Sequence, residues 1–294
     1  MGVKYSCEPP VDLLRLILAR FLLKKAGMIS STHNPRMQLV RSLLGRSKER
    51  HETGAFIAEG VRLVEEALAA DWPFRFVLVA ESLGDRGRKL VSSLQMRGVE
   101  VESVVDNLMQ STSETEASQG LIAVLESCPL AIPSEPSLIL IPDMIRDPGN
   151  LGALLRSAAA AGVQAVYLPP ETTDAFAPKV VRAGMGAHFR LPIVSLEWDA
   201  IRARTRGLIV YLAELEAETL CWQADFKSPL ALIIGGEAEG ASKAARQLAD
   251  QEVCIPMPGR SESLNAAVAG SILMFEVVRQ RETWRRLKPM PNKQ

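Results

Sequence analysis

Cysteine is scarce in this chain, and neither sign of charge is in excess. The cysteines (Cys7, Cys128, Cys221 and Cys254) lie far apart and form no CxxC pair, which argues against a disulfide framework and a zinc site. Lysine and arginine together number 34, as do aspartate and glutamate, so the net charge gives no support for nucleic-acid binding. We therefore expect a cytoplasmic protein without a metal ion, in which any RNA site is local.

Long apolar runs are also lacking. Residues 11–23 (VDLLRLILARFLL) are strongly apolar, but Arg15 and Arg20 interrupt them and the stretch is too short to span a bilayer. The pattern favours an amphipathic helix over a membrane anchor, and we expect no membrane partner. Residues 1–27 are an uncertain N-terminal extension, because Met28 begins a stretch that is typical of the start of a domain.

Two local clusters of basic residues stand out. Each is equally compatible with RNA contact and with a solvated helix face or tail. The clusters consist of Arg36, Arg41, Arg46, Lys48 and Arg50, and of Arg279, Arg281, Arg285, Arg286, Lys288 and Lys293.

The spacing of apolar residues predicts two alternating α/β units. In residues 28–126 it predicts helices at 34–44, 61–68 and 86–96 and strands at 56–58, 76–80, 99–105 and 121–125. Residues 127–137 contain three prolines and are typical of a linker. In residues 138–294 it predicts a helix at 151–161 and strands at 138–141, 165–168, 208–212 and 230–234. Short apolar runs that alternate with helices indicate a mainly parallel sheet.

Three segments carry the functional signal. The first, RDPGNLGALLRSAAAAG, begins at Arg146; Asn150 is placed to cap a helix that Gly162 ends, and Gly149 and Gly152 allow close backbone approach. The second, IIGGEAEG, is a buried strand that enters a glycine turn without the GxGxxG or GxxxxGK[ST] spacing, which argues against a dinucleotide fold and a phosphate loop.

The third segment is Ile255–Gly259 followed by SLNAAVAG from Ser263. Ser263 and Asn265 bring a hydroxyl and an amide to a helix start, where free backbone N–H groups favour a polar ligand. Taken alone, the first segment is equally compatible with a structural role, the glycine turn is a weak signal, and the third segment favours a capped, tightly packed helix over a site. The cluster of small residues at Ala266–Gly270 predicts close packing.

Together and in this order, the three segments resemble the three motifs of the SpoU (TrmH-like) branch of the SPOUT RNA 2′-O-ribose methyltransferases. RAGMGAHFRLP at residues 182–192 resembles the family's intervening segment. FIAEGVRLV and SQGLIAV in the upstream half resemble the L30e-like substrate-binding domain that accompanies this family. The resemblance covers residues 28–290.

The resemblance implies an α/β fold in which a SPOUT-type, mainly parallel sheet with a deep trefoil knot follows a smaller L30e-like α/β domain. It implies a homodimer that uses S-adenosylmethionine and acts on RNA. The residues that it assigns to the cofactor are Leu212, Ala213, Gly235, Gly236, Glu237, Ile255, Met257 and Leu264.

The resemblance also assigns catalytic roles. Arg156 is the leading candidate, proposed in the family as a base, although a guanidinium stays protonated in proteins and could instead bind a phosphate or a developing alkoxide. Asn150, Glu237, Ser263 and Asn265 are implied to position Arg156 and the ribose. Gly236 and Ala266-Ala267 depart from the residues usual in relatives, and the departures remove an amide and a hydroxyl from this hydrogen-bond network.

Ribosomal RNA is the favoured substrate because of the L30e-like domain, and transfer RNA is the alternative. A non-catalytic RNA-binding protein of the same fold and a small-molecule enzyme remain rival hypotheses. The intact polar residues argue against the former, and the L30e-like segments argue against the latter.

Overall fold

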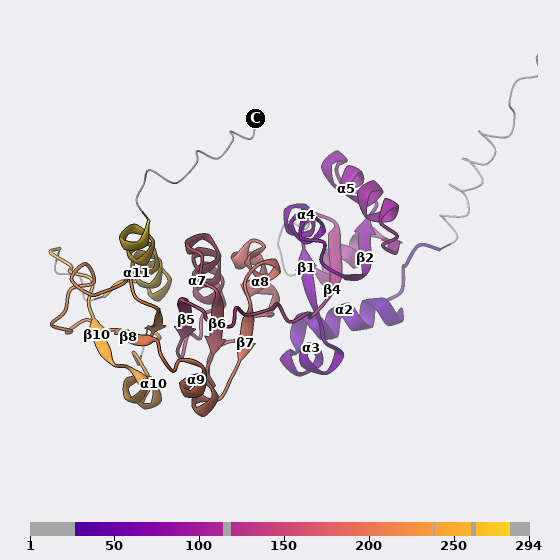
Figure 1. The fold of residues 1–294 in the computed structure, drawn as a ribbon. Coiled ribbons are helices and arrows are strands. Elements are labelled where there is room, and N and C mark those ends of the chain that lie inside the picture. Colours follow the sequence, from indigo (N-terminus) through magenta and orange to yellow (C-terminus); the bar gives the residue numbers. More distant parts are fainter. Residues whose placement is uncertain (1–26, 114–118, 238, 260–262, 283–294) are drawn as a thin grey trace, which may run out of the picture.

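The computed structural model describes residues 27–113, 119–237, 239–259 and 263–282. The predicted amphipathic helix at residues 11–23 and the basic residues from Arg285 onward lie outside these ranges. The described residues form a four-stranded and a six-stranded sheet, each with helices on both faces (Figure 1). None of the described helices has both the length and the apolar composition needed to cross a bilayer.

The first sheet is mixed, with the order β1-β4-β2-β3. β4 runs antiparallel to both of its neighbours, and β2 and β3 are parallel. Helices α4 and α5 cover one face, α2 and α6 cover the other, and the short α3 follows α2. The strands are β1 (Ala55–Glu59), β2 (Phe74–Ala80), β3 (Val101–Val104) and β4 (Leu121–Glu126). The helices are α2 (Pro35–Gly45), α3 (Ser47–Thr53), α4 (Val61–Ala69), α5 (Asp85–Met96) and α6 (Asp106–Thr112).

The second sheet is parallel throughout, with the order β10-β8-β9-β5-β6-β7. Helices α7, α8 and α11 lie on one face, and α9 and α10 on the other (Figure 1). The strands are β5 (Leu138–Pro142), β6 (Ala165–Leu168), β7 (Ile193–Ser195), β8 (Ile209–Ala213), β9 (Leu230–Ile234) and β10 (Gln251–Val253). The helices are α7 (Pro148–Ala161), α8 (Pro178–Gly184), the 3₁₀ turn η1 (Ala187–Phe189), α9 (Trp198–Arg204), α10 (Lys243–Leu248) and α11 (Ala266–Arg281).

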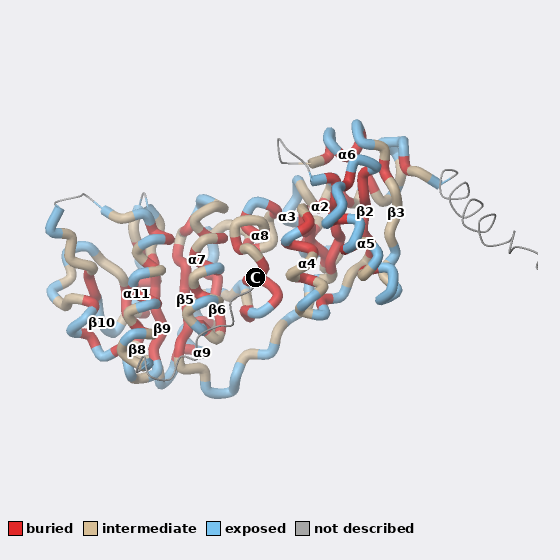
Figure 2. Tube along the Cα trace, turned by 90° about the horizontal axis from the view of Figure 1, so that it is seen from above, coloured by how far each residue is buried: buried red, intermediate tan, exposed pale blue. Residues whose placement is uncertain are grey.

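The central strands β5 and β9 explain why the sequence predicted a parallel sheet. Every residue of both strands is buried, so neither strand shows the apolar and polar alternation of a half-exposed strand. Figure 2 shows this buried centre, with exposed residues on the surrounding helices and loops. The prediction of β9 is confirmed to the residue.

Helix α7 begins earlier than the sequence predicted. Asp147, not Asn150, is the N-cap residue, and its carboxylate accepts a hydrogen bond of 2.8 Å from the Asn150 backbone N–H. Pro148 decides between the two cap formers, because proline is favoured at the first helical position, where no backbone donor is needed. The predicted end is confirmed, since Gly162 takes a left-handed conformation with φ 77°. The side chain of Asn150 is therefore free of the capping role.

Small residues bring α8 and α11 close to α7. A Cβ on Gly152 would lie 2.4 Å from the Cβ of Ala183 in α8, and one on Gly270 would lie 2.4 Å from a methyl carbon of Leu154. These contacts confirm the close packing predicted around Gly152 and Gly270. Ala158 and Ala266 are buried in the same layer, so these alanines serve packing within the chain.

Five of the basic residues flagged in the sequence have structural partners, among them Lys48, which pairs with Glu52 one helical turn away at 3.6 Å. Arg36 pairs with Glu100 and lies over the Phe76 ring, and Arg279 pairs with Glu276. Arg281 donates hydrogen bonds to the carbonyls of Phe226, Ser137 and Ser228, which anchors the end of α11. Arg50 binds Asp174.

His188 is a buried imidazole between α7 and α8. Its Nε2 lies 2.7 Å from the Ala175 carbonyl, and because a carbonyl only accepts, Nε2 carries the proton. Burial lowers the pKa of His188 to about 4, since the charged form would lose its hydration.

The pKa of His188 predicts a loss of stability in mild acid. The unfolded chain takes up a proton near pH 6.5 and the folded chain does not until about pH 4, so the free energy of unfolding falls as pH drops through this window. Between pH 7.5 and pH 5 the contribution of His188 amounts to about 2 kcal/mol. The glutamine amide in His188→Gln still donates to Ala175 but does not titrate. Urea unfolding should therefore show that the free energy of unfolding of this variant falls by about 2 kcal/mol less between pH 7.5 and pH 5 than that of the wild type. Equal acid sensitivity in both proteins would contradict the assignment.

Candidate functional site

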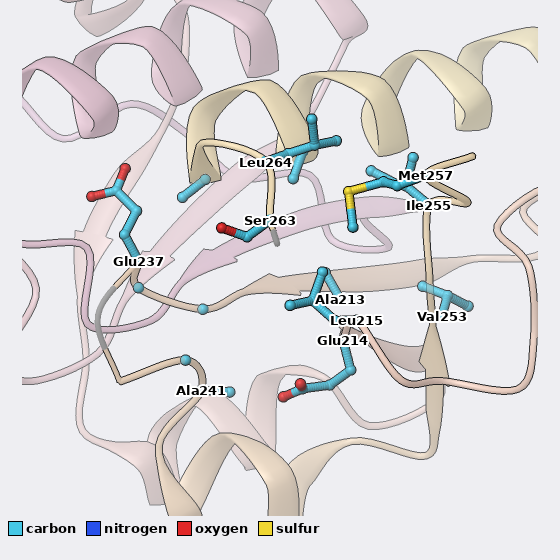
Figure 3. A pocket seen from close by; sticks show the side chains of 15 residues that line it. Ala213, Glu214, Leu215, Glu237, Ala241, Val253, Ile255, Met257, Ser263 and Leu264 are labelled. Atoms are coloured by element: carbon cyan, nitrogen blue, oxygen red, sulfur yellow. The ribbon is translucent and has the colours of Figure 1, made fainter. Parts of the chain in front are cut away.

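The carboxyl ends of the parallel strands meet at one edge of the second sheet, and a cavity of about 370 Å³ lies there. Loops after β8, β9 and β10 and the start of α11 form its walls. Figure 3 shows Ile255, Met257 and Leu264 on its apolar side, with Glu237 and Glu214 on other sides. The cavity thus combines an apolar wall with carboxylates and backbone turns.

The structure brings together most of the residues predicted to bind a cofactor. Those that line the cavity are Ala213, Gly235, Gly236, Glu237, Ile255, Met257 and Leu264. The side chain of Leu212 does not reach it: Leu212 is fully buried on the opposite face of the sheet, against α9 and α10. Alternate residues of a strand face opposite sides, so Ala213 and Leu212 cannot both point toward the cavity.

Sequence reasoning missed several lining residues, notably Glu214, Leu215 and Val253. Glu214 directly follows β8, and its carboxylate pairs with Arg246 of α10 at 2.6 Å. A polar residue directly after a predicted central strand is the signal that could have identified it.

The glycine turn after β9 is tightly packed. Gly236 and Gly240 exchange backbone hydrogen bonds of 3.1 Å, and a Cβ on Gly235 would lie 2.7 Å from the Ala241 nitrogen. A Cβ on Gly236 would lie 2.4 Å from the Met144 carbonyl oxygen in the loop after β5. Both positions therefore require glycine for steric reasons.

Asp143 supports this turn from behind. It is fully buried, and its carboxylate accepts a 2.6 Å hydrogen bond from the backbone N–H of Ser242, the N-cap residue of α10. Burial raises the pKa of Asp143, only partly opposed by the hydrogen bond from Ser242. The loop after β5 is thus attached to both ends of the glycine turn.

Three polar side chains from distant segments meet at the rim of the cavity. Asn150 donates to the Glu237 carboxylate, and the Asn265 amide donates to Asn150 at 2.9 Å and to Glu237 at 3.1 Å. The other end of Asn265 caps α11 by accepting from the backbone of Ala267 and Val268. These residues, which we call the rim cluster, unite the three segments identified in the sequence.

Two further predicted residues lie outside the rim cluster. Ser263 lines the cavity, directly before Leu264. Arg156 is exposed on α7, next to Ser157, which bonds Ser271 of α11 at 2.7 Å. Within the described part of the chain, the Arg156 guanidinium makes no hydrogen bond or ion pair, so it is available to an anionic ligand. The described residues contain no cluster that could hold a metal ion.

Substitutions at Asn265 separate its capping role from its role in the rim cluster. Asn265→Ala removes the cap and should lower the free energy of unfolding by about 1 kcal/mol, measured by urea denaturation. Asn265→Asp retains a cap acceptor but loses the donor to Asn150 and Glu237, so its stability should lie closer to that of the wild type. An alanine variant as stable as the wild type would contradict the capping role.

Comparisons with known proteins agree with this geometry. Residues 137–275 match the SpoU rRNA Methylase family, and residues 34–123 match the MRM3-like substrate binding domain. The 23S rRNA (guanosine-2′-O)-methyltransferase RlmP of Bacillus subtilis is 33% identical, over 80% of this chain and 92% of its own. A 23S rRNA (uridine-2′-O)-methyltransferase of Streptomyces viridochromogenes is also 33% identical, over 85% of this chain and 92% of its own.

Among solved structures, the AdoMet-bound rRNA methyltransferase of Sinorhizobium meliloti superposes with a TM-score of 0.75. It is 31% identical, and the match covers 87% of this chain and 98% of that one. Similarity at this level over both sheets establishes the relationship. The chain belongs to the SpoU rRNA methylase family.

Proposed function

We propose that this protein transfers the methyl group of S-adenosylmethionine to a ribose 2′-hydroxyl of ribosomal RNA. The observation that carries the proposal is the rim cluster, which joins all three family motifs at the mouth of one cavity. The Bacillus and Streptomyces relatives, both named as 23S rRNA methyltransferases, support ribosomal RNA over transfer RNA. Ribosomal RNA as substrate is also the reason that we propose the cytoplasm as its compartment.

The cavity fits the cofactor. Ile255, Met257 and Leu264 can enclose a purine ring, while the backbone of the glycine turn and Glu214 offer polar partners. The cofactor found in the Sinorhizobium structure supports this assignment. Bound there, S-adenosylmethionine supplies a methyl group on a positively charged sulfur.

The chain's own residues have two tasks in the reaction. The ribose oxygen must be held in line with the methyl group, and as it attacks it must release its proton, which solvent water accepts while the chain stabilises the developing alkoxide. Asn150, Asn265 and Glu237 are hydrogen-bonded to one another and supply the donors and acceptor that orient the ribose. Ser263 adds a hydroxyl at the cavity wall.

Arg156 is best suited to stabilise negative charge. A guanidinium stays protonated at neutral pH, and this one is exposed and unpaired within the described residues. We assign it to an RNA phosphate or to the developing alkoxide, not to the role of a base.

The fold assignments rest on the same relationship. We propose domains at residues 28–126 and 138–294, joined by a linker at 127–137. We also propose the family's trefoil knot: α11 follows the edge strand β10, yet it returns to pack on α7 and β9 in the middle of the sheet.

Arg156→Ala tests the proposed reaction. Because Arg156 is exposed and makes no hydrogen bond or ion pair with any residue that the structure describes, the variant should retain its stability and its S-adenosylmethionine affinity. Tritiated methyl transfer to large-subunit ribosomal RNA, taken from a strain that lacks the gene, should fall at least about 100-fold.

Gly235→Val provides the reciprocal control. Its side chain would collide with Gly240 and Ala241, so calorimetry should show loss of S-adenosylmethionine binding.

Near-normal turnover in Arg156→Ala would remove Arg156 from the mechanism. Unchanged cofactor affinity in Gly235→Val would place the cofactor elsewhere.

A homodimer through α11 is a further part of the proposal. Val268, Ile272 and Phe275 repeat at helical spacing and are 47%, 39% and 48% exposed, an apolar face that is unusual on a monomer's surface. The expected dimer should appear by light scattering at micromolar concentration, and Phe275→Asp should shift it toward monomer. Met96→Asp, at an apolar residue 81% exposed on α5, is the matched control and should leave the mass unchanged. A monomeric wild type would refute the dimer.

A further inference from the structure

The two sheets share a hydrophobic core. Phe56 and Trp72 belong to the first sheet unit, and they pack against Phe176 at 5.0 Å and Phe189 at 5.3 Å, respectively, between ring centroids. Phe189 is 4% exposed. Figure 1 shows α8 of the second unit directly beside β1 of the first. A shared aromatic core opposes the relative motion that is otherwise the default between domains.

A buried ion pair crosses the same interface. Asp174 accepts from Nε and Nη2 of Arg50 at 2.8 and 2.7 Å and from the Ser47 hydroxyl at 2.9 Å. The Arg50 side chain is 6% exposed and that of Asp174 is 13% exposed. Arg50 also donates to the Leu43 carbonyl at 2.6 Å, which fixes the guanidinium to the end of α2. Removing one member of such a pair leaves the other charged group buried without its partner.

Asp174 and Phe176 belong to one segment, residues 169–177, which runs from the carboxyl end of β6 to the start of α8. We call it the bridging segment. Its second half contacts the first sheet unit through Asp174 and Phe176. The carbonyl of Ala175 is held from the other side by His188.

The first half of the bridging segment contacts the loop that leads into the first family motif. The Thr172 hydroxyl donates to the Pro142 carbonyl at 2.9 Å, and the Thr173 N–H donates to the Ile145 carbonyl at 3.0 Å. Glu171 pairs with Arg146 at 3.4 Å and has a positive φ of 66°, which is strained for a residue with a side chain. The loop from Pro142 to Arg146 continues directly into Asp147 and α7, which carries Asn150 and Arg156.

We propose that Arg50 and Asp174 are positioning residues for methyl transfer: through the bridging segment they fix the RNA-binding unit relative to the rim cluster. The proposal rests on the proposed function, because it assumes that RNA held by the first unit presents its ribose to the second. An error of about 1 Å in that placement can slow a reaction about 100-fold without weakening binding. The pair thus acts on turnover more than on affinity.

Asp174→Asn is the direct test, with the full-length protein, S-adenosylmethionine and large-subunit ribosomal RNA from a strain that lacks the gene. The value of kcat at saturating RNA should fall by about 10- to 100-fold. The affinities for S-adenosylmethionine and for RNA should change little, since neither cavity nor RNA-binding surface is altered. Asp71→Asn is the matched control: its pair with Arg97 is exposed, and its kcat should equal that of the wild type.

A distance measurement tests the same idea without activity. Spin labels at Met96→Cys in α5 and Arg204→Cys in α9 report the distance between the two units. Cys7 and Cys128 are replaced by serine so that they take no label, and unlabelled protein is added in excess. The distribution of distances should be narrow in the parent protein and broader in Asp174→Asn. Equally narrow distributions in the two proteins would overturn the positioning proposal, whether or not the wild type methylates RNA. A wild type that methylates no RNA would instead refute the proposed function.

Two further variants keep the test decisive if Asp174→Asn does not fold. Thr172→Val removes the hydroxyl that holds Pro142 and leaves the ion pair intact, and Arg50→Lys keeps the charge but loses the paired N–H donors. Each should lower kcat by a smaller factor, with cofactor affinity retained. A parallel loss of cofactor affinity and kcat would indicate a general loss of structure, and an unchanged kcat would show that the contact has no positioning role.

Discussion

In a parallel sheet the carboxyl ends of all strands lie at the same edge, and the site of this protein depends on that constraint. The ends of β5, β8, β9 and β10 bring Asn150, Glu214, Glu237 and Ile255 to one edge, although more than one hundred residues separate the first from the last. The rim cluster then joins three of the loops by side-chain hydrogen bonds. Each of these hydrogen bonds acts over a few ångströms only, and the sheet is what brings the distant segments within that distance.

The parts of the fold that could be predicted from the sequence are those fixed by local patterns. The apolar run at residues 230–234 fits one strand, and Gly162 ends its helix because it can adopt a positive φ. The site residues followed from the family resemblance, which depends on the three motifs in their joint order and not on any single one. The side chain of Leu212 faces away from the cavity, because a motif identifies the strand end and not which alternate residue faces the ligand, so only its backbone is left for the predicted cofactor contact.

Contacts between distant segments outside the three motifs could not be predicted. The cluster containing Arg36 and Arg50 was equally compatible with RNA contact, yet Arg36 binds Glu100 and Arg50 binds Asp174, 124 residues away. The spacing of charges along the chain indicates only which residues are neighbours on one helix or strand. These ion pairs depend instead on how distant helices, strands and loops pack together. The start of α7 was missed for a different reason, since Asp147 and Asn150 are both good caps and Pro148 selects between them.

The loop from Pro142 to Arg146 explains how these separate features act together. Asp143 holds the start of α10, Met144 packs on Gly236 with a positive φ of 55°, and Pro142 and Ile145 accept hydrogen bonds from the bridging segment. A non-glycine residue in that conformation is strained by about 1 kcal/mol or more, and it persists only where surrounding contacts determine it. Here those contacts come from the glycine turn after β9 on one side and, on the other, from the bridging segment, which packs against the first sheet unit. A shift of the glycine turn or of the bridging segment must therefore move this loop, and with it α7, which carries Asn150 and Arg156.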